Sequence, residues 1–522
     1  MRRPVFTWKT AFLLVIMLNF LTHHYIPARY GGRAMFGDQA AFLETSQNMI
    51  ITQRIIGKGD LYQNGFGFQL YNTMLSCLLD LNVTFLFDYF IPYQGTLIAI
   101  VYFIMSREFL KDEGTALLST MFLSIQSEII FMTSWGTHER VTMMLIFMMV
   151  TCMKRSFSMV DVKEVRRHIA LTYWFAINMM CMNVFFSIST IIAIGISMVI
   201  GIIFSRYRIV NTSYVRLVFV MGICLVIAFY MMFFVYTPAK TYLMGVKSTF
   251  NQVELIFGGL EQEDSFTKKF PQYRYVEKAY INPNLFLMLR SYDFIILPIG
   301  FMSVVGIIKG MLKRRHVPGK EDIALLVFIY LGFFLQFLFT IFFDRVGMYS
   351  SNVELRIFPY VHIFTAPLAA KLIVERIRDF RVSRRVTAVA LLTSFIVISV
   401  FLNLLKSSHE PSVNMHWVHA NEADFINARW LCETPHSRPV FHGGVITSII
   451  FGRIGFECEE EAKFGDTTHK GSNPGVYVDS DRDKLGGFFG GVDRIRKDED
   501  IYRLSKSDRV YDNGESSTYW LG

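Results

Sequence analysis

Charged residues and cysteines are both scarce in this chain of 522 residues. Charged side chains make up 18% of it, below the roughly 25% of soluble globular proteins, whereas apolar residues make up 52%. The 6 cysteines form no CxxC sequence and have no zinc-type spacing with histidine. These shortages exclude an ordinary soluble protein and give no sign of a cysteine-based metal site.

No nucleotide or nucleic-acid partner is indicated either. The chain contains no P-loop, no GxGxxG that opens a helix after a strand, and no HExxH. Its net charge of +9 is uneven, because residues 406–522 hold 14 Lys and Arg against 19 Asp and Glu, which leaves 38 against 24 on residues 1–405. Lys and Arg gather in cytoplasmic loops of membrane proteins, so the basic part needs no nucleic acid to explain it.

Long apolar runs are the strongest feature of the sequence. A bilayer core about 30 Å thick is crossed by about 20 residues of helix. Eleven runs approach that length, near 10–27, 91–107, 114–132, 139–153, 168–186, 187–204, 216–236, 291–309, 323–343, 356–375 and 386–405. The sequence therefore predicts a mainly α protein, a polytopic transmembrane helical bundle of about 11 spans in the lipid bilayer.

The distribution of Lys and Arg predicts the orientation of these spans. Arg2, Arg3 and Lys9 precede or begin the first run, and no small-x-small cleavage site follows it, so we interpret it as an uncleaved anchor with its N-terminus inside. Most Lys and Arg of the bundle then fall in inner loops, and the short outer loops hold only Arg140, Arg345 and Arg356. This asymmetry agrees with the positive-inside rule and predicts a multi-pass protein of the cell membrane.

One further apolar stretch must not cross the membrane if this orientation is right. Residues 67–88 are apolar enough to span, but Asp80 and Asp88 interrupt them. We expect an interfacial helix or a hairpin that returns to the outer face. A single crossing would invert the following loops and violate the positive-inside rule.

The predicted organisation has two domains. Residues 1–405 form the transmembrane domain, with outer loops at 28–66 and 237–290, and residues 406–522 form a soluble extracytoplasmic domain. This tail alternates a helical stretch with short strand-like runs and contains Asn-Gly, a hairpin signal, so we expect a small α/β or α+β fold. Whether its two cysteines pair stays open.

The first outer loop holds a carboxylate that suits chemistry at a membrane surface. Asp38 follows Gly37 and precedes a stretch, 39–51, that can form an amphipathic helix. The plain structural interpretation is that Asp38 caps this helix by accepting hydrogen bonds from backbone N–H groups. With Arg29 and Arg33 nearby, Asp38 also offers a base for an acceptor hydroxyl, and the arginines offer cations for a phosphate. Transfer of a sugar from a lipid phosphate needs both.

In this loop, its apolar runs and its soluble tail, the chain resembles the GT-C superfamily of polytopic glycosyltransferases, which use polyprenyl- or dolichyl-phosphate sugars. The resemblance implies a cytoplasmic N-terminus, an acidic motif in the first outer loop and interfacial helices after it. Many members carry two adjacent acids there, whereas this chain has Asp38 and Gln39, so the cofactor stays unknown and use of a divalent metal ion stays open. The last residues, from Tyr511 to Tyr519, are similar to tails of archaeal membrane proteins of this type.

Two further segments place ionisable or polar residues at predicted outer ends of spans. They are His138, Glu139 and Arg140 at one span, and Arg356, Tyr360 and His362 at another. Charged residues at such positions are costly and usually face a partner or a cavity. The plain interpretations are an interfacial turn and an arginine that snorkels to the interface. In GT-C proteins a late span often opens with an arginine, an aromatic residue and a proline, and the second segment looks like that pattern.

The resulting hypothesis is a membrane glycosyltransferase that moves a sugar from a polyprenyl-phosphate-linked or dolichyl-phosphate-linked donor to an acceptor glycan, lipid or protein on the extracytoplasmic face. Asp38 would act as general base or orient the acceptor, and Glu139 would assist as a second acid or as a metal ligand. The residues expected to bind substrate, chiefly the donor phosphate, are Arg33, His138, Arg140, Arg356 and Tyr360.

Other functions stay open on the sequence alone. A transporter or flippase usually carries ionisable residues near the midplane and is often built from repeats, whereas here the charges cluster at span ends and no matching halves are evident. A lipid-linked glycan polymerase or ligase shares an arginine-rich outer face but does not need an acid after the first span. A purely structural membrane protein is a further alternative. The loop 237–290 fits a lid over the donor, an acceptor groove or a solvated connector.

Overall fold

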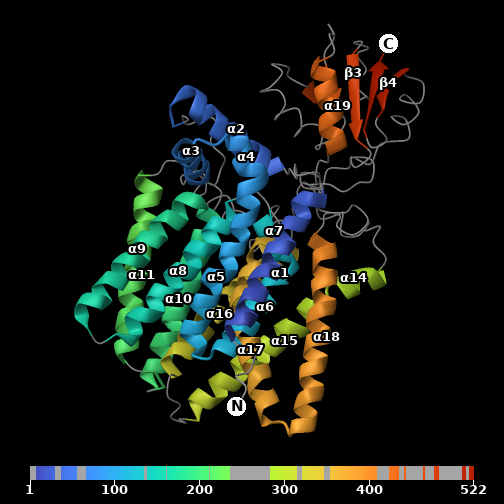
Figure 1. The fold of residues 1–522 in the computed structure, drawn as a ribbon. Coiled ribbons are helices and arrows are strands. Elements are labelled where there is room, and N and C mark those ends of the chain that lie inside the picture. Colours follow the sequence, from blue (N-terminus) through green and yellow to red (C-terminus); the bar gives the residue numbers. More distant parts are fainter. Residues whose placement is uncertain are drawn as a thin grey trace, which may run out of the picture.

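The computed structural model describes most of the helical part of the chain and the strands of its tail. The described residues are 8–29, 37–55, 66–134, 138–159, 161–207, 209–210, 212–235, 283–313, 320–345, 353–407, 422–433, 440–442, 463–464, 475–480, 508–512 and 516–521. Figure 1 shows a bundle of long helices with the N-terminus at one end and α2, α3 and the strands at the other. We call these the N-terminal end and the α2–α3 end.

The long helices fall on the predicted apolar runs. They are α1 (Trp8–Arg29), α5 (Ile91–Leu110), α8 (Glu139–Ser158), α9 (Val162–Met182), α10 (Val184–Arg206), α11 (Thr212–Val235), α15 (Ser291–Leu312), α16 (Lys320–Arg345), α17 (Val353–Asp379) and α18 (Val382–Ser407). Among the described residues, 6 helices are long and apolar enough to cross a membrane, or up to 7 with one bent pair. The chain is therefore a mainly helical, multi-pass membrane protein, and the count of eleven spans stays a prediction.

The predicted run 114–132 is not one straight helix, which corrects the expectation from hydropathy. It is a pair, α6 (Glu113–Ser124) and α7 (Ser127–Ser134), bent by 70°. The side chain of Gln126 explains the break, because its Oε1 accepts a hydrogen bond of 2.7 Å from the backbone N–H of Ile129. A side chain that takes over a backbone N–H in this way competes with the regular helical bond.

Short helices cover the α2–α3 end. They are α2 (Gly37–Thr52), α3 (Gly67–Leu79), α4 (Val83–Phe85) and the π-helix η1 (Leu86–Phe90), which leads into α5. Helix α3 stops at Asp80, whose φ of 52° is left-handed, and Asn82 then caps α4 by accepting from the backbone N–H of Thr84. The 13 residues of α3 extend about 20 Å at 1.5 Å each, which is too short to cross a bilayer core. This length agrees with the predicted orientation, which requires that residues 67–88 do not cross the membrane once.

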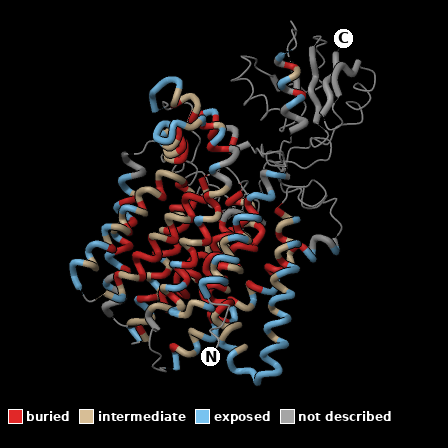
Figure 2. Tube along the Cα trace, viewed as in Figure 1, coloured by how far each residue is buried: buried red, intermediate tan, exposed pale blue. Residues whose placement is uncertain are grey.

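Helix α17 is the centre of the bundle and α18 its periphery. Within their apolar spans, 78% of α17 is buried against 11% of α18. Figure 2 shows the buried residues concentrated in the middle of the bundle.

The neighbouring helices α10 and α16 approach closely at Gly332, where an added Cβ would lie 2.4 Å from the carbonyl oxygen of Ala193. Small residues allow such backbone contact between membrane helices.

The tail contains α19 (Glu422–Glu433) and a 5-stranded sheet in the order β2-β1-β3-β5-β4. The strands are β1 (Val440–His442), β2 (Lys463–Phe464), β3 (Gly475–Ser480), β4 (Asp508–Asp512) and β5 (Ser516–Leu521). Strand β1 runs parallel to β2 and β3, whereas β5 runs antiparallel to β3 and β4. The side chain of Cys432 and all of Cys458 lie outside the described residues, so their pairing and the domain class stay predictions.

Candidate functional site

The first residues of α8 form a buried, ionisable segment at the α2–α3 end. His138 precedes the helix with 1% of its surface exposed, and Arg140 in its first turn is 0% exposed. Glu139 lies between them, and its Oε2 is 3.4 Å from Nδ1 of His138. A fully buried guanidinium in an apolar bundle is costly unless it serves a partner or a ligand. The structure thus buries residues that the sequence placed in an outer loop.

Two short helices cover this segment. The ring of Phe42 on α2 lies 5.0 Å from the His138 ring, edge-on, and that of Phe68 on α3 lies 6.3 Å from it. Tyr71, also on α3, lies within electrostatic range of Arg140. Its hydroxyl accepts a hydrogen bond of 3.2 Å from Nε2 of Gln94 on α5. The aromatic side chains of α2 and α3 therefore shield the start of α8 from solvent.

Tyr360 brings α17 to the same place. It is buried and lies within electrostatic range of the Glu139 carboxylate, and its hydroxyl makes no hydrogen bond to a described residue. The rings of Phe186 on α10 and Phe333 on α16 pack against it, with centroids 4.6 and 5.6 Å away. Residues that are remote in the sequence, on α8 and α17, thus lie near one another at the α2–α3 end.

His23 on α1 is a neighbour that the sequence did not indicate. Its Nε2 lies 2.7 Å from Oγ1 of Thr133, near the end of α7, and its Nδ1 lies 2.7 Å from the carbonyl oxygen of Asn19. Gly95 on α5 makes room for the ring, because a Cβ there would lie 2.3 Å from it. The sequence contained one indication of this position, because His23 is an ionisable residue near the outer end of the apolar run 10–27.

The remaining predicted site residues are only partly described. Asp38 lies in the first turn of α2 and Arg356 in the first turn of α17, but both side chains lie outside the described part of the chain. Arg33 lies outside it entirely, as does most of the loop 237–290, apart from α14 (Pro283–Leu289) and Arg290. The structure therefore brings together His138, Glu139, Arg140 and Tyr360, and it does not test the distances to the other three.

Metal binding is not shown by the described side chains. Among them, no group of three or more His, Cys, Asp or Glu could hold a metal ion. Glu139 and His138 are the described groups that could contribute ligands to one at this site, with oxygen and nitrogen donors.

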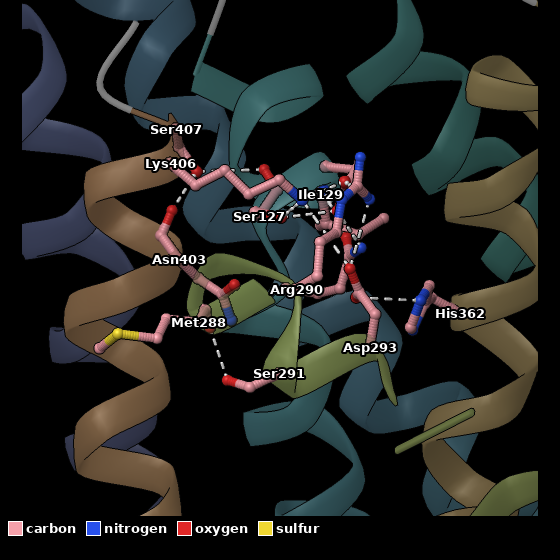
Figure 3. A network of polar contacts seen from close by, with 12 residues as sticks. Ser127, Ile129, Met288, Arg290, Ser291, Asp293, His362, Asn403, Lys406 and Ser407 are labelled. Atoms are coloured by element: carbon pink, nitrogen blue, oxygen red, sulfur yellow. Dashed lines mark hydrogen bonds and ion pairs between the residues drawn. The ribbon is translucent and has the colours of Figure 1, made fainter. Parts of the chain in front are cut away.

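A second cluster of ionisable residues, largely shielded from solvent, lies where α7, α15, α17 and α18 meet (Figure 3). We call it the Glu128 network: Glu128, Arg290, Asp293, His362 and Lys406. Nη1 of Arg290 lies 2.9 Å from Oε1 of Glu128 and 3.4 Å from Oδ2 of Asp293. Nζ of Lys406 pairs with the same Oε1 and donates to Oγ of Ser127 at 2.7 Å. Nε2 of His362 lies 3.3 Å from Oδ1 of Asp293.

Of the five residues of this network, only His362 was predicted from the sequence. The signal for the others was present, because Glu128 interrupts an apolar run and Asp293 and Lys406 lie at the ends of two others. Ionisable residues in such places usually pair with one another.

Comparison with known proteins gives the fold. No family model and no curated protein matches the chain. Among solved structures, it is similar to the archaeal oligosaccharyltransferase AglB from Archaeoglobus fulgidus in complex with an inhibitory peptide and a dolichol-phosphate, with a TM-score of 0.53 and 12% identity over 85% of this chain. The chain spans 63% of the length of that protein. Another AglB structure, tethered with an acceptor peptide, has a TM-score of 0.54 and 10% identity, covering 99% of this chain and 74% of that one.

A bacterial structure gives the same result over nearly the whole length of both chains. ArnT from Cupriavidus metallidurans, bound to undecaprenyl phosphate, has a TM-score of 0.50 and 12% identity, covering 99% of this chain and 98% of its own. AglB and ArnT are both polytopic membrane glycosyltransferases of the GT-C superfamily. The predicted resemblance is therefore confirmed at the level of fold.

Proposed function

We propose that the protein is a membrane glycosyltransferase that transfers a sugar from a polyprenyl-phosphate-linked donor to an acceptor on the extracytoplasmic face. The observation that carries this proposal is the buried segment from His138 to Arg140, together with Tyr360, at the α2–α3 end. A desolvated guanidinium at the end of a span suits a phosphate, which it can bind through two parallel hydrogen bonds. The GT-C fold and the polyprenyl phosphates bound to AglB and ArnT support this assignment.

Each residue has a defined role in the proposed reaction. The acceptor nucleophile attacks the anomeric carbon, the bond from that carbon to the phosphate oxygen breaks, and the proton of the acceptor passes to Asp38 as general base. The leaving phosphate keeps the bonding electron pair, and its charge is matched by Arg140 with Arg356 or Arg33. Glu139 assists as a second acid or as a metal ligand, while His138 and Tyr360 line the substrate site.

The positions of Lys and Arg support an extracytoplasmic active site. Helices that run from the α2–α3 end to the N-terminal end carry basic residues in their last turns, namely Arg107, Arg155, Arg206, Lys309, Arg376 and Arg378. By the positive-inside rule the N-terminal end then faces the cytoplasm. The strands of the tail lie at the other end of the molecule (Figure 1). We infer that residues 406–522 form an extracytoplasmic domain that binds the acceptor or supports the outer loops.

A reconstituted transfer assay tests the proposal. Wild type and the variants Asp38→Ala and Arg356→Ala are placed in liposomes with a radiolabelled polyprenyl-phosphate sugar, and release of free polyprenyl phosphate is measured. We expect both variants to lose most of the release, while Arg167→Ala, an exposed arginine near the N-terminal end, keeps the wild-type rate. Release that is unaffected by Asp38→Ala would remove this carboxylate from the mechanism.

One observation favours a transporter or flippase as second candidate. The 70° break between α6 and α7 places the carboxylate of Glu128, whose side chain is 14% exposed, at a helix interruption, a feature of secondary transporters. The same liposomes distinguish the two functions. Counter-flow of a solute without any transfer of sugar would favour transport.

A further inference from the structure

The Glu128 network lies beside the proposed site but contains none of its reacting groups. Its two carboxylates, Glu128 and Asp293, face two cations, Arg290 and Lys406, so the charges within it balance. The exposed fractions of the four side chains are 25% or less. Such groups are costly to bury, and they leave an uncompensated charge when one partner is removed.

Helix α7 links this network to the buried segment of α8. Glu128 lies in the first turn of α7 and accepts hydrogen bonds from Ser127 and Gln126. Five residues later, Thr133 is hydrogen-bonded to His23, and the next described residue after Ser134 is His138. A helix of 8 residues is not stable by itself in isolation. Besides the core residues Ile129 and Met132, the polar contacts of Glu128 and Thr133 therefore help to fix the position of α7 in the bundle.

The other members of the network lie on α17 and α18. His362 is two residues from Tyr360 on α17 and contacts Asp293. Within α18 the buried residues are Ser399, Asn403 and Ser407, all polar and spaced four residues apart on one face. Ser407 donates to the backbone carbonyl of Ser127 on α7 at 3.1 Å. Lipid competes equally well for apolar surfaces, so polar contacts of this kind fix the relative positions of membrane helices.

We propose that Glu128 and Asp293 are positioning residues for the transfer reaction. Through Arg290 and Lys406 they hold α7 in its bent orientation, and through His362 they hold α17. They thereby set the spacing between Arg140 and Glu139 on α8 and Tyr360 on α17. This inference rests on the proposed function. Neither carboxylate touches substrate, so their removal changes the geometry of the reacting groups and leaves the groups themselves in place.

Steady-state kinetics test this role against a purely structural one. In Glu128→Gln and Asp293→Asn we expect kcat to fall about 10- to 100-fold, because small displacements of reacting groups have effects of this size, while KM for the lipid donor stays within about threefold. The matched control is Asp322→Asn. It breaks a comparable buried pair near the N-terminal end, where Oδ1 of Asp322 lies 2.8 Å from Nζ of the fully buried Lys154. This control should keep the wild-type kcat.

Hydrogen exchange provides a readout that needs no activity. Amides of residues 127–134 should exchange faster in Glu128→Gln than in wild type, and those residues should exchange at the wild-type rate in Asp322→Asn. If Glu128→Gln does not fold, Glu128→Gln with Lys406→Met restores the charge balance and is measured in its place.

The outcomes separate the two proposals. Unchanged exchange in 127–134, or an equal loss of kcat in Asp322→Asn, would overturn the positioning role. A wild type that transfers no sugar from any polyprenyl-phosphate donor would overturn the proposed function, and the exchange of α7 would still decide whether Glu128 positions it.

Discussion

The two ends of the bundle bury charge in different ways. At the N-terminal end a hollow of about 710 Å³ is lined by Trp8, Arg107, Glu108, Lys111, Asp112, Glu113, Gly114 and Arg155. Its charges form ion pairs that are partly exposed, as in the contact of 2.8 Å between Arg155 and Glu108, and the fully buried Lys154 at this end is matched by Asp322. At the α2–α3 end, by contrast, Arg140 is fully buried and the Glu128 network connects helices remote in the sequence.

This difference indicates where function lies. Exposed ion pairs contribute about 0–1 kcal/mol each and are common at the ends of membrane helices. Removing a charged side chain from water costs several kcal/mol unless an opposite charge compensates it. Charged residues inside a membrane protein are therefore usually functional. The α2–α3 end is therefore the part of the molecule where substitutions should affect transfer, and the N-terminal end is the part where they should affect stability alone.

The largest effect is expected from the buried arginine. In Arg140→Gln, release of polyprenyl phosphate should fall about 10²- to 10³-fold, as when one charge-stabilising donor is lost from an active site. The control is Arg155→Gln on the same helix, near its other end, where the side chain is 43% exposed. That variant should lose less than about twofold, because an exposed pair contributes little. Equal rates of polyprenyl-phosphate release in Arg140→Gln and Arg155→Gln would contradict the proposed functional difference between the α2–α3 end and the N-terminal end.

A smaller effect is expected from the contact between α1 and α5. In Gly95→Ala the new Cβ would lie 2.3 Å from the ring of His23, which two hydrogen bonds hold in place. Overpacking of this kind lowers the free energy of unfolding by about 1–3 kcal/mol. Gly195→Ala on α10 is the matched control, because nothing lies within 4 Å of its added Cβ. Thermal unfolding in detergent should show a lower midpoint temperature for Gly95→Ala and the wild-type midpoint for Gly195→Ala. An equal decrease in both variants would contradict the close approach of Gly95 to the His23 ring.

Much of this fold follows from the sequence because the bilayer fixes the length of an apolar helix. The predicted runs coincide with long helices, and Asp80 ends α3 where it interrupts residues 67–88. The break at Gln126 could not be predicted in the same way. It is accompanied by a contact between Glu128 and Lys406, which are 278 residues apart. A hydropathy profile averages over neighbouring residues and contains no information on contacts between segments so far apart.

The candidate site shows the same division. His138, Glu139, Arg140 and Tyr360 could be predicted because they are polar residues at the ends of apolar runs. Their burial could not, since it depends on Phe42 and Phe68, which reach His138 from separate helices. Roles for Asp38 and Arg356 stay predictions, because their side chains lie outside the part of the chain that the structure describes.

The smallest effect concerns Asp112, which caps α6 at the N-terminal end. Partial burial acts to raise the pKa of this carboxyl, but hydrogen bonds from Thr115 and from Arg378 outweigh it, so the pKa lies below its usual value of 3.8. Loss of an N-cap costs about 1 kcal/mol, so Asp112→Ala should unfold at a slightly lower temperature near pH 7 and transfer sugar at the wild-type rate.

The pH dependence of that difference follows from the direction of the pKa shift. A carboxyl whose pKa is lower in the folded state stabilises the protein above its unfolded pKa and loses this contribution as the pH falls through the folded value. The gap in unfolding temperature between wild type and Asp112→Ala should therefore be constant near neutral pH and narrow below about pH 4. A gap that widens in acid would show that Asp112 is not held by Arg378 and Thr115, and a loss of transfer in this variant would extend function to the N-terminal end.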